Sequence, residues 1–156
     1  MNGVKGPRPD HTHALLGYVL DGLRKDMAHA IRTTSMPDLP PVLRDLRSSH
    51  IRLLSLTPVE GMRISDLAEV ANMSKQSLGE FATALESDGL LESVRDPADK
   101  RVRIVRPTAL GLRVVEAAET LMAEVESAWR ARVGAREWDR LRALLTIAEE
   151  RGPGAH

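Results

Sequence analysis

Hydrophobic residues recur every three or four positions through most of this chain, and this spacing predicts helices towards both of its ends. A first helix is predicted from Thr12 to Thr34, and one or two further helices between Leu43 and Leu56. A long helix is predicted from Thr108, its N-cap, to Val133, and a last helix from Ala135 to Glu150 after an interruption at Gly134. The chain is therefore predicted to be mainly helical.

Two short helices separated by a tight turn are predicted in the middle of the sequence. The segment Ile64–Ala71 has the pattern of one helix, with Ser65 as its expected N-cap. Ser74 is placed to cap a second helix from Lys75 to Asp88, and Gly89 follows where a left-handed residue commonly ends a helix. The pair is typical of a helix-turn-helix, and an ordinary helix pair in a small helical domain is the alternative.

The segment after this helix pair alternates between charged and apolar residues, which is the pattern of a β-hairpin. Leu91–Arg95 can form one strand, the Asp96-Pro97 dipeptide favours a turn, and Arg101–Arg106 can form the second strand. Met62–Ile64 can add a short third strand to this sheet. A solvated surface hairpin is the alternative for this segment alone, but its place after two short helices favours a winged helix-turn-helix. The predicted fold class is mainly α, with an α+β core.

Charge is distributed unevenly along the chain. The net charge is zero, whereas a DNA-binding protein gains much of its affinity from neutralising phosphates. A DNA-binding face would therefore require that basic residues are segregated from acidic ones. The hairpin meets this requirement, because five basic residues accompany two acidic ones there: Arg95, Lys100, Arg101, Arg103 and Arg106, with Asp96 and Asp99.

Length and composition exclude several classes of protein. A chain of 156 residues is expected to form one domain, and the absence of cysteine excludes disulfides and thiol-based redox sensing. No apolar run approaches the ~20 residues of a membrane-spanning helix, so a cytoplasmic protein without membrane contact is expected. The sequence has no glycine-rich phosphate-binding loop and no Ser/His/Asp order that resembles a catalytic triad, so neither an enzyme nor a cofactor is expected.

The segment from Leu46 to Gly111 resembles the MarR family of bacterial winged helix-turn-helix transcriptional regulators. In that family the second helix of the motif enters the major groove and the wing reaches the neighbouring minor groove. The resemblance implies the same fold here, with a helical dimerisation region built from the N- and C-terminal helices. It is carried by Met62–Ala68, Met73–Leu78, Leu85–Leu90, Asp96–Arg101 and the Thr-x-x-Gly sequence Thr108–Gly111.

The resemblance also implies a DNA-binding surface made by the second helix and the wing. Lys75 and Gln76 lie in the first turn of that helix, and these residue types can read guanine and adenine in the major groove. Arg101 would occupy the wing tip, with Asp99 orienting it. The expected DNA-binding residues are Ser65, Ser74, Lys75, Gln76, Ser77, Arg95, Lys100, Arg101 and Arg103.

Apolar stripes on the terminal helices favour a homodimer, because two neighbouring stripes exceed what one intramolecular partner covers. The resemblance implies the same, and packing within a single chain is the alternative. The expected plan is an arm (1–12), a single MarR-type domain (13–150) and a tail (151–156), with dimerisation helices at 13–45 and 108–150 around a DNA-binding lobe at 46–107. The expected dimerisation residues are Leu16, Leu20, Trp129, Trp138, Leu141 and Leu145.

The predicted function is a dimeric, sequence-specific regulator of double-stranded DNA with a pseudo-palindromic operator, acting as a repressor that a small-molecule effector releases. His50 is a candidate for the effector cleft, with a packing role as its alternative. Gly79 and Glu80 depart from an ideal recognition helix, and they leave open a protein-interaction module that does not bind DNA. A metal-responsive regulator that uses His11, His13 and His50 is a further alternative, although the histidines have no metal-site spacing.

Overall fold

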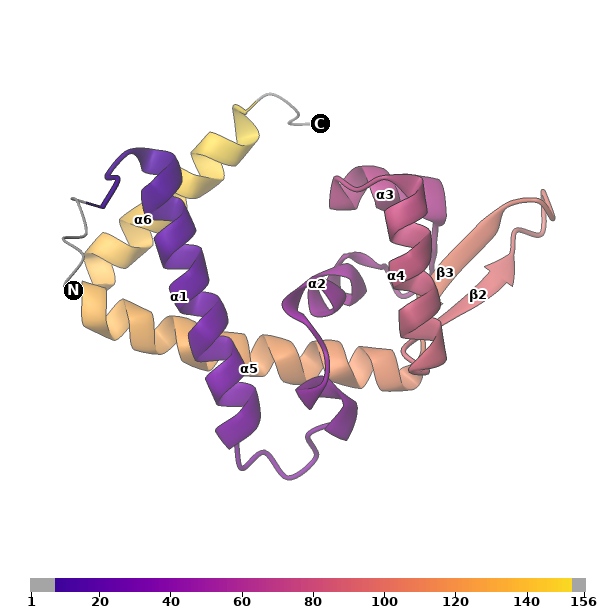
Figure 1. Ribbon diagram of the computed structural model, residues 1–156, viewed down its shortest axis with the longest axis horizontal. Coiled ribbons are helices and arrows are strands. Elements are labelled where there is room, and N and C mark those ends of the chain that lie inside the picture. Colours follow the sequence, from indigo (N-terminus) through magenta and orange to yellow (C-terminus); the bar gives the residue numbers. More distant parts are fainter. Residues whose placement is uncertain (1–7, 153–156) are drawn as a thin grey trace, which may run out of the picture. The chain divides into compact units, whose positions relative to one another are not determined.

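The computed structural model of the protein describes residues 8–152, which are mainly helical and include one small antiparallel sheet (Figure 1). Residues 1–7 of the predicted arm and 153–156 of the predicted tail lie outside the described residues. None of the helices within 8–152 combines the length and apolar character that crossing a membrane requires. The elements are α1 (Thr12–Thr33), a 3-10 helix (Pro41–Arg44), α2 (Ser48–Leu56), β1 (Met62–Arg63), α3 (Ile64–Ala71), α4 (Lys75–Ser87), β2 (Leu91–Arg95), β3 (Arg103–Pro107), α5 (Ala109–Val133) and α6 (Ala135–Glu150).

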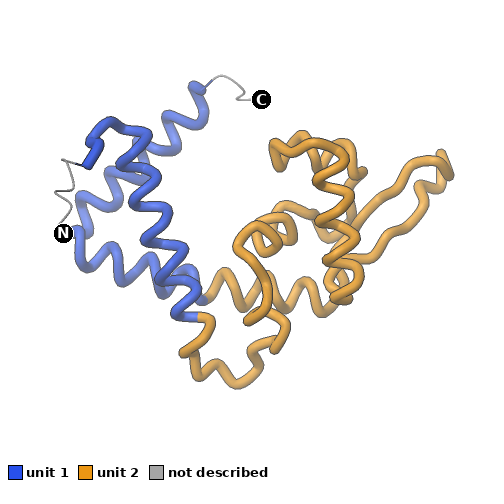
Figure 2. Tube along the Cα trace, in the orientation of Figure 1, with its two compact units in different colours: residues 1–30, 121–156 blue, residues 31–120 orange. Residues whose placement is uncertain are grey.

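The chain divides into two compact units (Figure 2). Unit 1 comprises residues 1–30 and 121–156, and unit 2 comprises residues 31–120. Unit 2 therefore contains the helix-turn-helix, the whole sheet and the first half of α5. Its core includes these leucine and valine side chains, each with at most 2% exposure: Leu43, Leu53, Leu54, Leu67, Leu78, Leu85, Leu90, Leu91, Val105 and Val114.

The sheet has the strand order β1-β3-β2, so the predicted third strand is confirmed. Met62 pairs with Val105 in β3, and on the other side of β3 Val94 pairs with Ile104. The β2–β3 hairpin projects beyond α3 and α4 (Figure 1). The second strand starts at Arg103 rather than at Arg101, so the prediction was wrong at this point. The Asp96 N–H donates to the carbonyl of Val102, which leaves Arg101 in the turn.

The corner between α3 and α4 follows from two capping residues. Asn72 takes a left-handed conformation with φ of 52° and ends α3. Ser74 caps α4 as predicted, because its hydroxyl oxygen accepts a hydrogen bond of 3.1 Å from the Ser77 N–H. The prediction of Ser65 as the cap of α3 was wrong. Arg63, the last residue of β1, holds that position without a capping hydrogen bond from its side chain, and the hydroxyl of Ser65 donates to the carboxylate of Asp66.

The end of α4 is joined to the beginning of α5 by hydrogen bonds around Gly89. Gly89 adopts a φ of 71°, and the N–H groups of Gly89 and Leu90 return to the carbonyls of Glu86 and Leu85, which is the Schellman arrangement. The Thr108 hydroxyl donates to the Gly89 carbonyl over 2.6 Å and accepts from the Gly111 N–H over 3.0 Å. Thr108 is therefore the N-cap of α5, as predicted, and also ties α5 to α4.

Substituting Gly111 by alanine is expected to lower the free energy of unfolding by about 1–3 kcal/mol, the usual cost of overpacking. A Cβ atom at this position would lie 2.1 Å from the carbonyl oxygen of Leu90, and a backbone atom cannot yield as a flexible side chain can. Urea unfolding followed by circular dichroism measures the change. Gly79→Ala is the matched control, since a Cβ there meets nothing within 4 Å and should stabilise the helix by roughly 1 kcal/mol.

Unit 1 is organised around two tryptophans. The Trp129 indole donates to the carboxylate of Asp26 over 2.7 Å, and its ring lies so close to Gly22 that a Cβ there would be 2.7 Å away. The Trp138 ring centroid lies 6.0 Å from that of Trp129, and Trp138 is only 5% exposed. Trp138, expected at the dimer interface, is thus buried within its own chain. Large apolar side chains of α1 and α6 remain exposed in this unit: Leu15, Leu16, Leu20, Leu144, Leu145 and Ile147.

Candidate nucleic-acid interface

Helix α4 has one buried face and one polar face. Leu78, Ala82 and Leu85 are fully buried, and their spacing places them along one side of the helix. Lys75 and Gln76 are both exposed in the first turn of the helix, and Gln76 lies on the side opposite the buried residues. The Gln76 amide nitrogen donates to the Glu80 carboxylate over 3.3 Å. The first turn of α4 is therefore held by its own core and cap, and it presents a cation and an amide to the outside.

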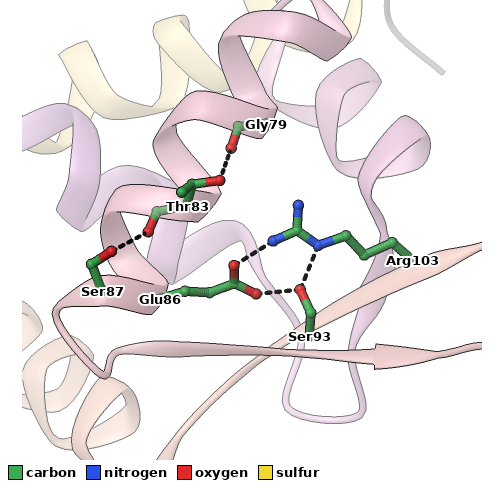
Figure 3. A network of polar contacts seen from close by, with 6 residues as sticks. All are labelled: Gly79, Thr83, Glu86, Ser87, Ser93 and Arg103. Atoms are coloured by element: carbon green, nitrogen blue, oxygen red, sulfur yellow. Dashed lines mark hydrogen bonds and ion pairs between the residues drawn. The ribbon is translucent and has the colours of Figure 1, made fainter.

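The remaining side chains of the polar face of α4 that are hydroxyls bond to their own helix. The Thr83 hydroxyl donates to the Gly79 carbonyl over 2.9 Å, and the Ser87 hydroxyl donates to the Thr83 carbonyl over 3.0 Å (Figure 3). These hydroxyls fold back onto their own helix, so they do not reach outwards. Gly79 adds no side chain between them, although open space surrounds it. The packing of this chain does not require a glycine at that position.

The basic side chains of the hairpin fall into two groups. In the first group each arginine forms an ion pair: Arg103 with Glu86, and Arg106 with Glu92 over 2.6 Å. In the second group the side chains are exposed and form no ion pair anywhere in residues 8–152. This second group consists of Arg95, Lys100 and Arg101, and Lys75 of α4 shares both properties.

The tip of the wing is shaped by two aspartates. Asp99 Oδ1 accepts the backbone N–H of Arg101 over 2.9 Å, so Asp99 acts on the Arg101 backbone. Asp96 is 8% exposed; its Oδ1 accepts the Ala98 N–H over 2.8 Å and its Oδ2 pairs with the Arg63 guanidinium over 3.0 Å. The Ala98 hydrogen bond and the Arg63 charge hold the pKa of Asp96 below its usual value of 3.8. Asp96 is therefore ionised at neutral pH and anchors the turn to β1.

The model of the MarR family matches residues 52–102, which run from α2 through the tip of the wing. Residues 52–102 form a MarR-family domain. The resemblance inferred from the sequence is thereby confirmed. None of the curated proteins matches this chain in sequence.

Solved structures of MarR-family regulators share the fold well beyond the matched segment. The apo form of wild-type MarR from E. coli is 18% identical, covers 90% of this chain and 98% of its own, and superimposes with a TM-score of 0.70. The S. aureus MepR–DNA complex is 16% identical, with coverage of 89% and 96% and a TM-score of 0.69. CouR from Rhodococcus jostii RHA1, bound to p-coumaroyl-CoA, is 19% identical, with coverage of 96% and 99% and a TM-score of 0.69. At these identities the likeness shows the fold.

Not every residue expected at the DNA-binding surface is free to reach outwards. Ser65 is half-buried and bonded to Asp66, and the Ser74 hydroxyl donates to that of Ser77 over 3.0 Å. Arg103 is held by Glu86. Lys75, Gln76, Arg95, Lys100 and Arg101 are exposed.

His50 of α2, which lies just before the matched segment, packs against α4. Its ring meets that of Phe81 in α4 edge-on, with 5.1 Å between the centroids, and its buried Nδ1 atom has no hydrogen-bond partner among residues 8–152. The rings of His11 and His13 stack with centroids 6.0 Å apart. Within residues 8–152, no three histidines, aspartates or glutamates gather in a group that could hold a metal ion.

Three structurally important contacts were not identified from the sequence. Asp96 was read as part of a turn signal and as a negative charge, but its side-chain hydrogen bond to the Ala98 N–H was not identified. The Arg52 guanidinium donates to the Ala71 carbonyl over 3.2 Å, which satisfies the C-terminal end of α3. Glu86 joins α4 to the wing. The Arg52 and Glu86 contacts join residues distant in sequence, and no local pattern marks them.

Proposed function

We propose that this protein is a dimeric transcriptional regulator that binds double-stranded DNA in a sequence-specific manner. Helix α4 would enter the major groove with Lys75 and Gln76 at the base edges, and the wing would follow the backbone into the neighbouring minor groove with Arg101 at its tip. MepR, a protein of the same fold, has been solved as a DNA complex. Recognition by the first residues of the second helix is the usual mode of a helix-turn-helix.

The observation that carries this proposal is the selective pairing of charges. Arg63, Arg103 and Arg106 are neutralised by acidic residues of the chain. Lys75, Arg95, Lys100 and Arg101 remain exposed and unpaired within residues 8–152. An exposed cation without a partner contributes to DNA binding when it replaces the condensed counterions of a phosphate. A neutral chain can therefore present a positive surface on α4 and the wing.

We propose that two copies of the chain associate through the terminal helices. The predicted division is retained, with residues 46–107 as the DNA-binding lobe and 13–45 and 108–150 as the dimerisation region. Leu16 and Leu20 on α1 and Leu145 on α6 are 43–47% exposed in the single chain, and Leu141, one turn before Leu145 on α6, is half-buried. Trp129 and Trp138 would support these helices from inside each subunit. A two-fold dimer requires a pseudo-palindromic operator.

We further propose that the protein is a cytoplasmic repressor that a small-molecule effector releases, without catalytic activity of its own. CouR, which shares the fold, has been solved with p-coumaroyl-CoA. In the present chain His50 is the candidate polar residue for an effector, since its buried Nδ1 lacks a partner and its ring touches Phe81 of α4. An effector that displaced this contact would act directly on the proposed recognition helix, and DNA would weaken its binding reciprocally.

Lys75→Ala and Gln76→Ala are expected to reduce discrimination among operator variants more than they reduce binding to unrelated DNA. Each wrong base pair at a site that a side chain reads costs about 1–3 kcal/mol, and this difference should shrink in the variants. Fragments selected from genomic DNA by the wild-type protein provide the operator, and fluorescence anisotropy at several salt concentrations provides the affinities.

Thr83→Ala, on the face of Gln76 but with its hydroxyl bonded to Gly79, is the matched control and should leave discrimination unchanged. Equal losses on all sequences in both variants would show that Lys75 and Gln76 touch phosphates only. If the wild-type protein binds no DNA in a salt-dependent manner, the proposal is wrong and a protein-interaction module becomes the better explanation.

A further inference from the structure

Three polar side chains form a closed ring between the proposed recognition helix and the wing. Glu86 belongs to α4, Ser93 to β2 and Arg103 to β3 (Figure 3). One oxygen of the Glu86 carboxylate accepts from Arg103 Nη2, and the other accepts from the Ser93 hydroxyl. The same hydroxyl oxygen accepts from Arg103 Nε over 2.6 Å. Both carboxylate oxygens and one edge of the guanidinium are therefore occupied within the ring.

The strand register explains why Arg103 turns towards the helix. Ser93 pairs with Val105, and Arg103 pairs with Arg95 in the same hairpin. Since alternate residues of a strand share a face, Arg103 lies on the face of Val105, which is fully buried. The Arg103 and Glu86 side chains are only 33% and 24% exposed, whereas those of Arg106 and Glu92 on the other face are 46% and 47% exposed.

The ring also resolves a conflict between like charges. Arg95 and Arg103 lie directly opposite each other in the β2–β3 ladder, and like charges in that position destabilise a hairpin. Glu86 neutralises Arg103, so Arg95 alone remains as the exposed cation of this pair. The wing thus retains its outward charges at Arg95, Lys100 and Arg101.

We propose that Glu86 is a positioning residue that determines the sequence specificity of this interface, an inference that rests on the proposed DNA binding. Glu86 fixes the wing relative to α4, and it keeps Arg103 away from the phosphates. Phosphate contacts add affinity for every sequence, whereas discrimination between sequences requires that the reading side chains are held in register. Releasing Arg103 would therefore strengthen indiscriminate binding at the expense of specificity.

Glu86→Gln is expected to lower the ratio of operator affinity to affinity for scrambled DNA by about tenfold, within the usual range of coupling between sites. The slope of log affinity against log salt should become steeper by about 0.9, the contribution of one further phosphate contact. Arg103→Gln is expected to lower the same ratio while leaving the salt slope unchanged, because Arg103 touches no phosphate in the wild-type complex.

Glu92→Gln is the matched control. It removes the same charge and releases an arginine, Arg106, on the same hairpin, but the Glu92 ion pair does not reach α4. The ratio of operator affinity to affinity for scrambled DNA should therefore remain at the wild-type value in Glu92→Gln, even if its slope of log affinity against log salt becomes steeper. An unchanged ratio in Glu86→Gln, or an equal fall in Glu92→Gln, would overturn the inference.

Hydrogen exchange in the free proteins tests the link without DNA. The amides of Val102 and Asp96, which close the wing turn, should exchange faster in Glu86→Gln and in Arg103→Gln than in the wild type or in Glu92→Gln. Equal exchange in all four proteins would contradict a structural link. The exchange measurement and the DNA measurement can disagree. If the two variants exchange faster but the wild-type protein does not distinguish operator from scrambled DNA, the DNA-binding proposal has failed, and with it the specificity role of Glu86.

Discussion

Replacing Leu16 and Leu145 together by glutamate is expected to convert the protein from a dimer into a folded monomer that no longer binds its operator. Both side chains are already exposed in the single chain, at 44% and 43%. A monomer that never paired would therefore tolerate glutamate there with little loss of stability, since surface substitutions usually change it by less than about 0.5 kcal/mol.

The effect on the dimer should be large because each substitution occurs twice at a two-fold interface. Burying one leucine contributes about 1.5–3 kcal/mol, so each doubled leucine corresponds to a factor of at least about a hundred in the dimer dissociation constant. Sedimentation velocity across a range of concentrations measures this constant, and anisotropy measures operator binding in the same samples.

Val59→Glu is the matched control for this experiment. Val59 is 63% exposed, but it belongs to unit 2 and lies outside the proposed dimerisation region. It should leave both the dimer and operator binding intact. Unchanged dimerisation in the Leu16/Leu145 variant would show that these exposed leucines have another role, and a variant that unfolds would show that they belong to the core of the single chain.

Arg101→Ala is expected to weaken operator binding by about 1–3 kcal/mol and to leave the free energy of unfolding nearly unchanged. Arg101 lies in the wing turn, exposed, without an ion pair in residues 8–152. Its backbone N–H donates to Asp99, so the backbone that carries the side chain is held in place. An ordered backbone lowers the entropy cost of binding when Arg101 meets a phosphate or the minor groove.

The control is Arg106→Ala in the same hairpin, where the guanidinium is already paired with Glu92. It should reduce affinity far less than Arg101→Ala. Asp99→Ala should have an intermediate effect, because it removes the hydrogen bond to the Arg101 backbone but not the charge. Equal losses at Arg101 and Arg106 would mean that the wing contributes only its total charge.

The sequence predicted those parts of the fold that depend on local signals. Ser74 and Thr108 cap their helices through their own hydroxyls, and Gly89 and Gly134 adopt positive φ angles where helices end or change direction. Each of these residues acts on backbone groups only a few positions away, so the local sequence is enough to predict its role. For the same reason the bounds of α4 and α6 were predicted to within a residue.

The failures arose where a distant residue competes with a local one. Ser65 is a good capping residue, but pairing of Met62 and Arg63 with β3 brings the start of α3 forward. Arg103 was expected to face DNA, and its ion pair with Glu86, which is 17 positions earlier, was not foreseen. Arg101 was predicted to lie in the strand, and the Asp96–Val102 hydrogen bond places it in the turn. Tertiary pairing determined all three outcomes.

A hydroxyl-radical footprint of the wild-type protein on a DNA fragment selected from the genome tests the central claim most directly. The account predicts two protected regions related by a two-fold axis, with centres ~10 base pairs apart as expected for a helix-turn-helix dimer. Protection should appear with a stoichiometry of two chains per site and should decline steeply as salt rises. A single asymmetric region protected by one chain, or no protection at any salt concentration, would contradict it.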